Sequence, residues 1–363
     1  MKVLGVSSGF HDASISVVED GKILFATHAE RYTRKKNDPN LPQHLLNTHA
    51  DVSVFYEDVK LKNERREYHH MSPVEYEDVC DYHLKHHESH AAAAYYTAPF
   101  SNDTAIVVID AIGEWQTSSI WIPKDKKLEC VWSENYPHSI GLFYSAITKR
   151  IGLKPNEDEY ITMGMAAFGE PIVNMRWCFD LPDRNWHKGF LLTDFQGYAP
   201  EDIAASAQLE VEKRINEIMK RARKFGKNLC YGGGVALNCV ANSKVVNKHF
   251  DKVWIFPNPG DAGSSLGAAL GYIGEQIEFK NCFLGYEIKG MPNPRKIVDS
   301  LLAYKVVGVA NGKAEFGPRA LGNRSLLGDV RYNIKSTVNR IKRRQKFRPF
   351  APAILEEYFD EYF

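Results

Sequence analysis

Hydrophobic and polar residues alternate at the start of the chain in the pattern of three short strands joined by tight turns. Asp20-Gly21 has the composition of a two-residue hairpin turn. The same plan recurs about a hundred residues later, again with a polar turn between the first two strands, which indicates an internal duplication. The predicted strands are residues 2–8, 13–19 and 22–28 in the first copy and 105–110, 118–122 and 128–132 in the second.

Later segments change to helical periodicity, with apolar residues three and four positions apart. We expect the glycine-punctuated residues 160–170 to line a cleft, and the charged, irregular residues 31–85 to form a helical insertion with loops. The predicted helices are 139–152, 204–225, 239–246 and 264–274, and two further strands are predicted at 228–231 and 253–257.

A helix-permissive segment with three histidines lies between the two copies. Its sequence is HHESHAAAA, residues 86–94, and the alanines favour a helix. His86 and His90 are four positions apart, so both imidazoles leave the same helix face, about 5–6 Å apart at Cβ. Two neutral histidines at this separation can share one transition-metal ion. The same spacing also occurs on ordinary polar helix surfaces, so further ligands are needed.

Two aspartates are candidates for those ligands. Asp110 ends a predicted strand of the second copy, and Asp261 lies on a loop just before the helix predicted at 264–274. Asp261 either caps that helix or delivers its carboxylate to a cleft between two lobes. Two histidines and two carboxylates form a mixed nitrogen and oxygen set that suits iron, manganese or zinc.

A run of three glycines, residues 232–234, follows the strand predicted at 228–231. Such a run lets backbone N–H groups approach a phosphate or an adenosine, and it also occurs in simple tight turns. Together with the duplicated strands it favours an α/β fold of the actin/hexokinase/Hsp70 (ASKHA) type. In that fold two ribonuclease-H-like lobes face one another, and each presents a hairpin turn to the phosphates of a nucleotide. The alternative is two unrelated three-stranded units.

Composition limits the class of protein. The 363 residues suffice for two or three domains, and the net charge of +1 argues against a surface built wholly for nucleic acid or membrane. Six scattered cysteines favour reduced thiols. No stretch approaches 18 apolar residues, and the first residues are too short a run for a signal peptide. We therefore expect a cytoplasmic protein.

Charge is uneven near the C-terminus. Residues 313–348 contain eleven lysines and arginines against only Glu315 and Asp329. Arginines and a serine around glycine turns suit phosphate oxyanions. A nucleic-acid patch or a solvated basic face would have a similar composition.

The chain resembles the O-carbamoyltransferases that tailor nodulation factors, cephamycins and aminoglycosides. The motifs that carry the resemblance run from one end of the chain to the other, in the order of the family. They are HDAS (11–14), HHESHAAAA (86–94), VVID (107–110), the segment 139–170, GGVALN (233–238), GDAGSSLGAAL (260–270), EFGPRALGNRS (315–325) and FRPFAPAIL (347–355).

The resemblance implies an enzyme in two parts. Residues 1–285 match a two-lobed transfer domain similar to the tRNA threonylcarbamoyl-transfer enzymes, with lobes of about 1–100 and 101–285. Residues 286–363 match the beginning of an α+β YrdC-like domain that uses carbamoyl phosphate and ATP to make carbamoyl adenylate. Members of the family extend further past FRPFAPAIL, so we expect this domain to be incomplete here, as a short natural form, a split protein or a truncation.

The resemblance also assigns residues. His86, His90, Asp110 and Asp261 match ligands of an iron-type metal, and His11 lies on the acceptor side, where it would accept the hydroxyl proton. Gly233, Gly234 and Asn238 match the nucleotide-contacting loop. The candidates for carbamoyl phosphate and the ATP phosphates are Arg319, Asn323, Arg324, Ser325, Lys346 and Arg348.

The function expected is ATP-dependent transfer of a carbamoyl group to a hydroxyl of a small molecule, sugar or nucleoside. The expected cofactors are a divalent metal, with iron favoured over manganese or zinc, and ATP with Mg. We expect no membrane and no nucleic acid as partner, and either a homodimer or a separate chain that completes the C-terminal domain. Rival interpretations are a tRNA threonylcarbamoyl transferase and a non-catalytic nucleotide-binding remnant; a sugar kinase of the same superfold fits least, because it needs no histidine pair.

Overall fold

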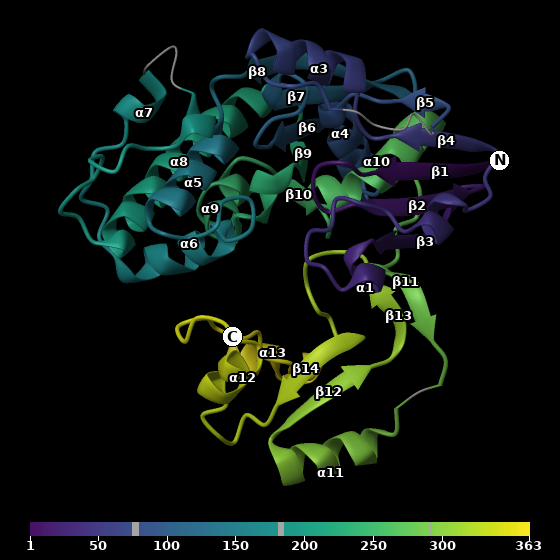
Figure 1. The fold of residues 1–363 in the computed structure, drawn as a ribbon. Coiled ribbons are helices and arrows are strands. Elements are labelled where there is room, and N and C mark those ends of the chain that lie inside the picture. Colours follow the sequence, from purple (N-terminus) through teal and green to yellow (C-terminus); the bar gives the residue numbers. More distant parts are fainter. Residues whose placement is uncertain (75–79, 181–184, 291) are drawn as a thin grey trace. The chain divides into compact units, whose positions relative to one another are not determined.

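Two five-stranded sheets with the same topology form the framework of the first part of the chain (Figure 1). In each sheet the first strand pairs antiparallel with the second and parallel with the fourth. This shared topology confirms the predicted duplication. The first sheet, ordered β3-β2-β1-β4-β5, contains β1 (Lys2–Ser7), β2 (Ser14–Glu19), β3 (Lys22–His28), β4 (Val52–Phe55) and β5 (Tyr82–His83). The second, ordered β10-β9-β6-β7-β8, contains β6 (Thr104–Ile109), β7 (Gln116–Lys124), β8 (Lys127–Asn135), β9 (Asn228–Gly232) and β10 (Lys252–Ile255).

This computed structural model describes residues 1–74, 80–180, 185–290 and 292–363. The chain divides into two units. The first contains residues 1–287 and 313–319, and the second contains residues 288–312 and 320–363. In the described residues no helix combines the length and the apolar character needed to cross a membrane.

The segment 31–85 is only partly the helical insertion that its composition suggests. It does contain short helices, but it also supplies two strands of the first sheet, β4 and β5, while residues 75–79 lie outside the described residues. A strand of four residues gives too few positions for its period to be recognised. The helices are α1 (Glu30–Thr33), α2 (Gln43–Leu46) and α3 (Val59–Tyr68).

Two helices pack between the sheets. The helix α4 (His86–Tyr96) contacts β6 and β9, and α10 (Asp261–Ile273) contacts α4 and the strands β1, β2 and β4. The approach is close, because a Cβ atom at Gly267 would lie 1.8 Å from the Ser89 carbonyl oxygen, and one at Gly5 would lie 1.7 Å from the Ser265 carbonyl oxygen. Small residues thus bring α4 and α10 together between the sheets.

A second layer of helices covers the other face of the second sheet, where α5 (Ile140–Arg150) and α8 (Pro200–Ala222) share a hydrophobic core with β6 and β9. The predicted helices at 139–152, 204–225, 239–246 and 264–274 are all present, and residues 160–170 are mostly helical. The elements are α5 (Ile140–Arg150), α6 (Glu159–Met165), η1 (Ala166–Phe168), α7 (Trp177–Asp180), η2 (Trp186–Lys188), α8 (Pro200–Ala222), η3 (Gly234–Leu237), α9 (Cys239–Lys244) and η4 (Val246–Lys248).

The C-terminal elements bury little. In the described part of the second unit, Val338 is the one buried hydrophobic side chain, and Asp329 and Asn339 are the buried polar ones. The strands β12 (Val306–Ala310) and β14 (Arg324–Gly328) pair antiparallel, and β11 (Phe283–Ile288) pairs with β13 (Gly312–Glu315). The elements are β11 (Phe283–Ile288), α11 (Pro294–Tyr304), β12 (Val306–Ala310), β13 (Gly312–Glu315), β14 (Arg324–Gly328), α12 (Lys335–Ile341), η5 (Glu356–Tyr358) and α13 (Phe359–Tyr362).

Candidate active site

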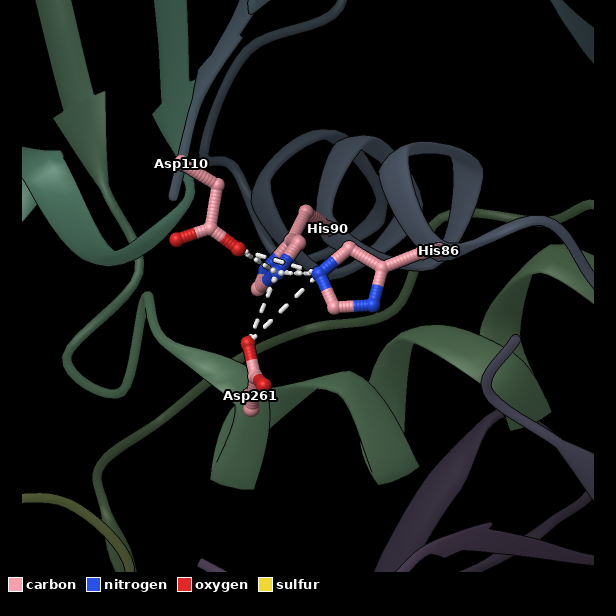
Figure 2. Close-up of side chains that lie close together, drawn as sticks. All are labelled: His86, His90, Asp110 and Asp261. Atoms are coloured by element: carbon pink, nitrogen blue, oxygen red, sulfur yellow. Dashed lines mark hydrogen bonds and ion pairs between the residues drawn. The ribbon is translucent and has the colours of Figure 1, made fainter. Parts of the chain in front are cut away.

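Four buried side chains from three elements converge at one point of the first unit (Figure 2). His86 and His90 lie one turn apart on α4, with their Nε2 atoms 3.1 Å apart. The carboxylate of Asp110, which follows β6, has Oδ2 at 3.0 Å from His86 Nε2 and 3.3 Å from His90 Nε2. Oδ1 of Asp261 lies 3.6 Å and 3.3 Å from the same two nitrogens. The four residues that the sequence singled out as ligands therefore come together.

The geometry fits one metal ion. Nitrogen and oxygen ligands bind first-row metals at about 2.0–2.2 Å, so neighbouring ligands of one ion lie about 3.0 Å apart in an octahedral site and about 3.4 Å apart in a tetrahedral one. The pairs measured here span 3.0–3.6 Å, and all four donor atoms lie within 4.8 Å of one another. Two imidazoles and two carboxylates also match the chemistry of iron, manganese and zinc sites.

The charges of this cluster favour a cation at its centre. Burial by itself lowers the pKa of His90, but hydrogen bonds to Asp110 and Asp261 raise it to about 10. Burial opposes the charged form of Asp110 as well, yet its hydrogen bonds to the two histidines hold its pKa well below the usual range. The carboxylates thus stay ionised and attract positive charge, whether as protons on the histidines or as a metal ion.

Neighbouring groups hold three of these four residues in place. The contacts are made by the side chains of His90 and Asp110 and by the backbone of His86. His90 Nδ1 lies 3.2 Å from Ser264 Oγ. The backbone N–H of His86 donates to Glu114 Oε1 at 2.8 Å, and the backbone N–H of Gly234 donates to Asp110 Oδ1 at 3.1 Å. Sequence reasoning missed Ser264 and Glu114, because neither spacing nor composition distinguishes them from other polar residues.

Asp261 occupies a different position from the loop site expected. It is the first residue of α10, and Gly260 is the N-cap. An acid in the first turn of a helix is stabilised by the helix dipole, and its side chain can project away from the axis. The carboxylate therefore reaches the histidines without acting as the N-cap.

His11 lies next to the cluster, in the turn between β1 and β2. Its Nδ1 atom is 3.0 Å from Asp12 Oδ2, and its Nε2 atom is 3.6 Å from Asp261 Oδ2. Burial lowers the pKa of His11, but the charge of Asp261 and the contact with Asp12 outweigh it and raise the pKa to about 9. In this arrangement His11 therefore holds a proton at neutral pH.

The glycine loop supports the cluster directly. Gly233 has φ of +87°, and a Cβ atom there would lie 2.2 Å from the Ile109 carbonyl oxygen, so the position requires glycine. The N–H of Gly233 donates to the Pro259 carbonyl at 2.9 Å, while that of Gly234 contacts Asp110. Both N–H groups are thus engaged within the protein, and contact of this loop with a nucleotide stays a prediction.

Asn238 is likewise engaged. Its Oδ1 caps α9 by accepting from the Ala241 N–H at 3.0 Å, and its Nδ2 donates to Gln208 Oε1 at 3.0 Å. Gln208 in turn accepts a hydrogen bond from the Tyr144 hydroxyl at 2.9 Å. The side chain therefore joins α8 to the start of α9, and its predicted role toward a nucleotide stays untested.

The second unit holds a pocket of about 330 Å³ beside β12 and β14. Two of the residues proposed for phosphates, Arg324 and Ser325, line it, together with Lys342, which sequence reasoning did not select. Burial and the charges of Arg344 and Arg348 lower the pKa of Lys342. The guanidinium of Arg324 donates hydrogen bonds to the backbone carbonyls of Asn311, Asn323 and Gly312. It therefore brings positive charge to the pocket while these donors are engaged within the protein.

The other residues predicted to bind phosphate do not line this pocket, and they differ in position and contacts. Asn339, which is buried, donates through Nδ2 to the backbone carbonyls of Lys346 and Arg348 and so orders that segment. Asn323 precedes Arg324, and its backbone carbonyl accepts from the Asn311 N–H at 3.0 Å. Arg319 is exposed and belongs to the first unit.

Comparison with known proteins places this arrangement in a family. The family model described as "Carbamoyltransferase N-terminus" matches residues 2–59, 55–176 and 187–270, which include all four members of the buried cluster. The chain belongs to the carbamoyltransferase family. A second family model, "Carbamoyltransferase C-terminus", matches residues 298–363 of this carbamoyltransferase. Family membership makes the chain an enzyme of carbamoyl transfer, as the resemblance in its sequence implied.

Relatives match along nearly the whole of this carbamoyltransferase. The uncharacterized protein sll1178 of Synechocystis sp. is 32% identical over 99% of this chain and 77% of its own length. Nodulation protein NolNO of Sinorhizobium fredii is 26% identical over 97% of this chain and 64% of its own length. Among solved structures, component A of the Acidaminococcus fermentans (R)-2-hydroxyglutaryl-CoA dehydratase aligns with 74% of this chain and 96% of its own, at 14% identity and a TM-score of 0.48.

Proposed function

We propose that this carbamoyltransferase is an ATP-dependent O-carbamoyltransferase whose transfer step takes place at His86, His90, Asp110 and Asp261. The observation that carries the proposal is the convergence of these four donor atoms, buried and within 4.8 Å of one another, in a chain of the carbamoyltransferase family. We further propose that the two five-stranded sheets form a nucleotide-binding fold of the actin/hexokinase/Hsp70 type, with Gly233, Gly234 and Asn238 on the nucleotide side.

The first half-reaction makes a reactive carbamoyl donor. Water cleaves carbamoyl phosphate to carbamate and phosphate, and a carbamate oxygen then attacks the α-phosphorus of ATP, which forms carbamoyl adenylate and releases pyrophosphate. We assign this step to the second unit, as part of a YrdC-like domain, because Arg324 and Lys342 bring positive charge, and Ser325 a hydroxyl group, to a pocket that can hold a phosphate group. Asn323, Lys346, Arg348 and Arg319 remain candidates for the same substrates.

The second half-reaction moves the carbamoyl group to a hydroxyl. The acceptor oxygen attacks the carbamoyl carbon, the bond from that carbon to the AMP phosphate oxygen breaks, and AMP leaves with the electron pair. A divalent metal held by the two histidines and two aspartates, for which iron is our first choice ahead of manganese or zinc, would polarise the carbamoyl oxygen. The buried carboxylates keep the charge and position of this site fixed before substrate arrives.

We assign the proton of the acceptor hydroxyl to His11. This histidine must be neutral to accept a proton, whereas its pKa beside the free carboxylate of Asp261 is about 9. Proton binding by His11 and cation binding by Asp261 are therefore coupled, since a cation that engages Asp261 lowers the pKa of His11. General base catalysis of this kind contributes about 10²–10⁴-fold to a rate.

The test measures the two half-reactions separately in the full chain. Carbamoyl-phosphate-dependent release of pyrophosphate from ATP reports the first, and mass-spectrometric detection of a carbamoylated product, from a panel of hydroxyl compounds with preformed carbamoyl adenylate, reports the second. We expect His11→Gln to keep pyrophosphate release and to slow transfer by at least about 10²-fold. Near-normal transfer by His11→Gln contradicts the role of His11, and absence of transfer by the wild-type chain contradicts the proposed reaction.

A further inference from the structure

The two histidines of the buried cluster differ in what their second ring nitrogen contacts. His90 Nδ1 has Ser264 Oγ at 3.2 Å. His86 Nδ1 is buried and has no hydrogen-bond partner among the described residues. A neutral histidine that binds a metal through Nε2 carries its proton on Nδ1, and a buried N–H group without an acceptor is unfavourable. If His86 is a ligand, an acceptor for that proton must be close.

The carboxylate of Glu57 faces this nitrogen. Its Oε2 atom lies 3.9 Å from His86 Nδ1, and its Oε1 atom accepts a hydrogen bond from Lys62 Nζ at 2.7 Å. Glu57 and Lys62 are both buried. The distance of 3.9 Å is longer than a hydrogen bond, but a shift of about 1 Å brings the two atoms into range.

The backbone around Glu57 is tied to the start of α4. The Tyr56 carbonyl accepts a hydrogen bond from Ser89 Oγ at 2.8 Å. Glu114 Oε1 accepts from the backbone N–H of Asp58 and from that of His86, each at 2.8 Å. These contacts hold Glu57 opposite the His86 ring, so the pairing does not depend on a flexible surface side chain.

We propose that Glu57 is a positioning residue that accepts the Nδ1–H of His86 and thereby keeps Nε2 of His86 directed at the metal. Metal-bound histidines commonly donate their second N–H to a carboxylate, which fixes the tautomer and the ring orientation. Lys62 sets how much of the Glu57 charge is available to His86, because both compete for the same carboxylate. The inference rests on the proposed metal centre.

The test is the affinity of the full chain for Co²⁺, measured by chelator competition after metal removal, with the visible spectrum of the bound ion as a second readout. Glu57→Gln keeps the size of the side chain and is expected to weaken Co²⁺ binding by about 10–100-fold. Lys62→Met is expected to bind Co²⁺ at least as tightly as the wild type, because it frees the carboxylate for His86. The double variant is expected to be as weak as Glu57→Gln.

A second glutamate–lysine pair serves as the control, in which Glu212 is buried and Lys244 is exposed. Glu212 of α8 accepts a hydrogen bond from Lys244 Nζ at 3.1 Å, and Glu212→Gln is expected to leave Co²⁺ affinity unchanged. Unchanged affinity in Glu57→Gln overturns the inference, as does recovery of affinity in the double variant, which would make an unpaired Lys62 the cause of the loss.

Two further outcomes are separable. Failure of the wild-type chain to bind Co²⁺ overturns the metal centre itself. Tight binding by the wild type together with an equal Co²⁺ affinity in Glu57→Gln overturns only the role of Glu57. If Glu57→Gln does not fold, as judged by circular dichroism, Lys62→Met decides: equal or tighter binding supports the inference and weaker binding contradicts it.

Discussion

The two units of this carbamoyltransferase hold their candidate residues in opposite ways. In the first unit, His86, His90, Asp110 and Asp261 are all less than 10% exposed, and three of them belong to the closely packed helices α4 and α10 between the two sheets. In the second unit, Arg324, Ser325 and Lys342 line an accessible pocket, and only three side chains among the described residues are buried. In the first unit, close packing holds the candidate ligands in place. In the second unit, the candidate residues are charged or polar groups on a sparsely packed surface.

Because of this difference, substitutions in the two units should affect stability and ligand affinity differently. Close-packed interiors respond to the addition or removal of a single methylene, because neighbouring groups have no room to adjust. Exposed charges bind ligands but contribute little to folding. Substitutions in the first unit should therefore alter stability and the site together, and substitutions in the second unit should alter ligand affinity alone.

The largest effect is expected where α10 meets α4. Gly267→Ala places a Cβ atom 1.8 Å from the Ser89 carbonyl oxygen, so the backbone of α4 must move. We expect a loss of about 3 kcal/mol in the free energy of unfolding and loss of bound metal. Gly308→Ala in the second unit is the matched control, because the nearest atom to a Cβ placed there is Leu326 Cδ2 at 3.8 Å. This substitution should change the free energy of unfolding by less than about 0.5 kcal/mol. Denaturant unfolding of both variants measures this, and equal effects contradict the contrast.

An effect of similar size but dependent on pH is expected at His28, on β3. Its ring is buried, its Nε2 accepts from Asn258 Nδ2 at 3.2 Å, and it meets Phe316 edge to face with ring centroids 5.0 Å apart. Burial, with a smaller effect from Arg31, lowers the pKa of His28 from 6.5 to about 4. The folded state therefore keeps His28 neutral.

The sign of the pH dependence follows. Between pH 6.5 and 4 the unfolded chain binds a proton at this residue and the folded chain does not, so stability is complete above pH 6.5 and falls as the pH decreases. The loss amounts to roughly 3 kcal/mol at pH 4. Unfolding of His28→Gln as a function of pH should show a shallower decline than the wild type; an identical slope would show that His28 does not titrate in this range.

The smallest effect is expected in the second unit. Lys342→Met removes one charge from the pocket and should raise the KM for carbamoyl phosphate in pyrophosphate release by about 10-fold, which corresponds to about 1.4 kcal/mol. Stability should not change. Arg340→Gln removes an equal charge from an exposed position of α12 that does not line the pocket, and it should leave KM unchanged; a similar increase in both variants would indicate a diffuse electrostatic effect instead of a site.

The contrast also explains what the sequence could predict. Strand alternation and the spacing of His86 and His90 are local patterns, so the duplicated strands and α4 were predicted from them. Asp110 and Asp261 were candidate ligands by their places in the chain, and the family resemblance implied that they join the two histidines. The strand β4 was missed because four residues carry too little periodicity, and Asp261 was placed before its helix because helix ends are poorly marked by sequence. Ser264, Glu114 and Glu57 were missed for another reason: their importance comes from long-range packing, to which no local spacing corresponds.

The central claim is that His86, His90, Asp110 and Asp261 hold one divalent metal ion. The most direct test loads the purified full chain with Fe²⁺ under anaerobic conditions, dialyses it to equilibrium, and measures bound metal beside the variant His90→Ala. We predict one ion per wild-type chain, a coordination shell of nitrogen and oxygen only in X-ray absorption, and at least about 10²-fold weaker retention by His90→Ala. A wild-type chain that retains no metal, or a His90→Ala chain that retains it equally well, would contradict the account.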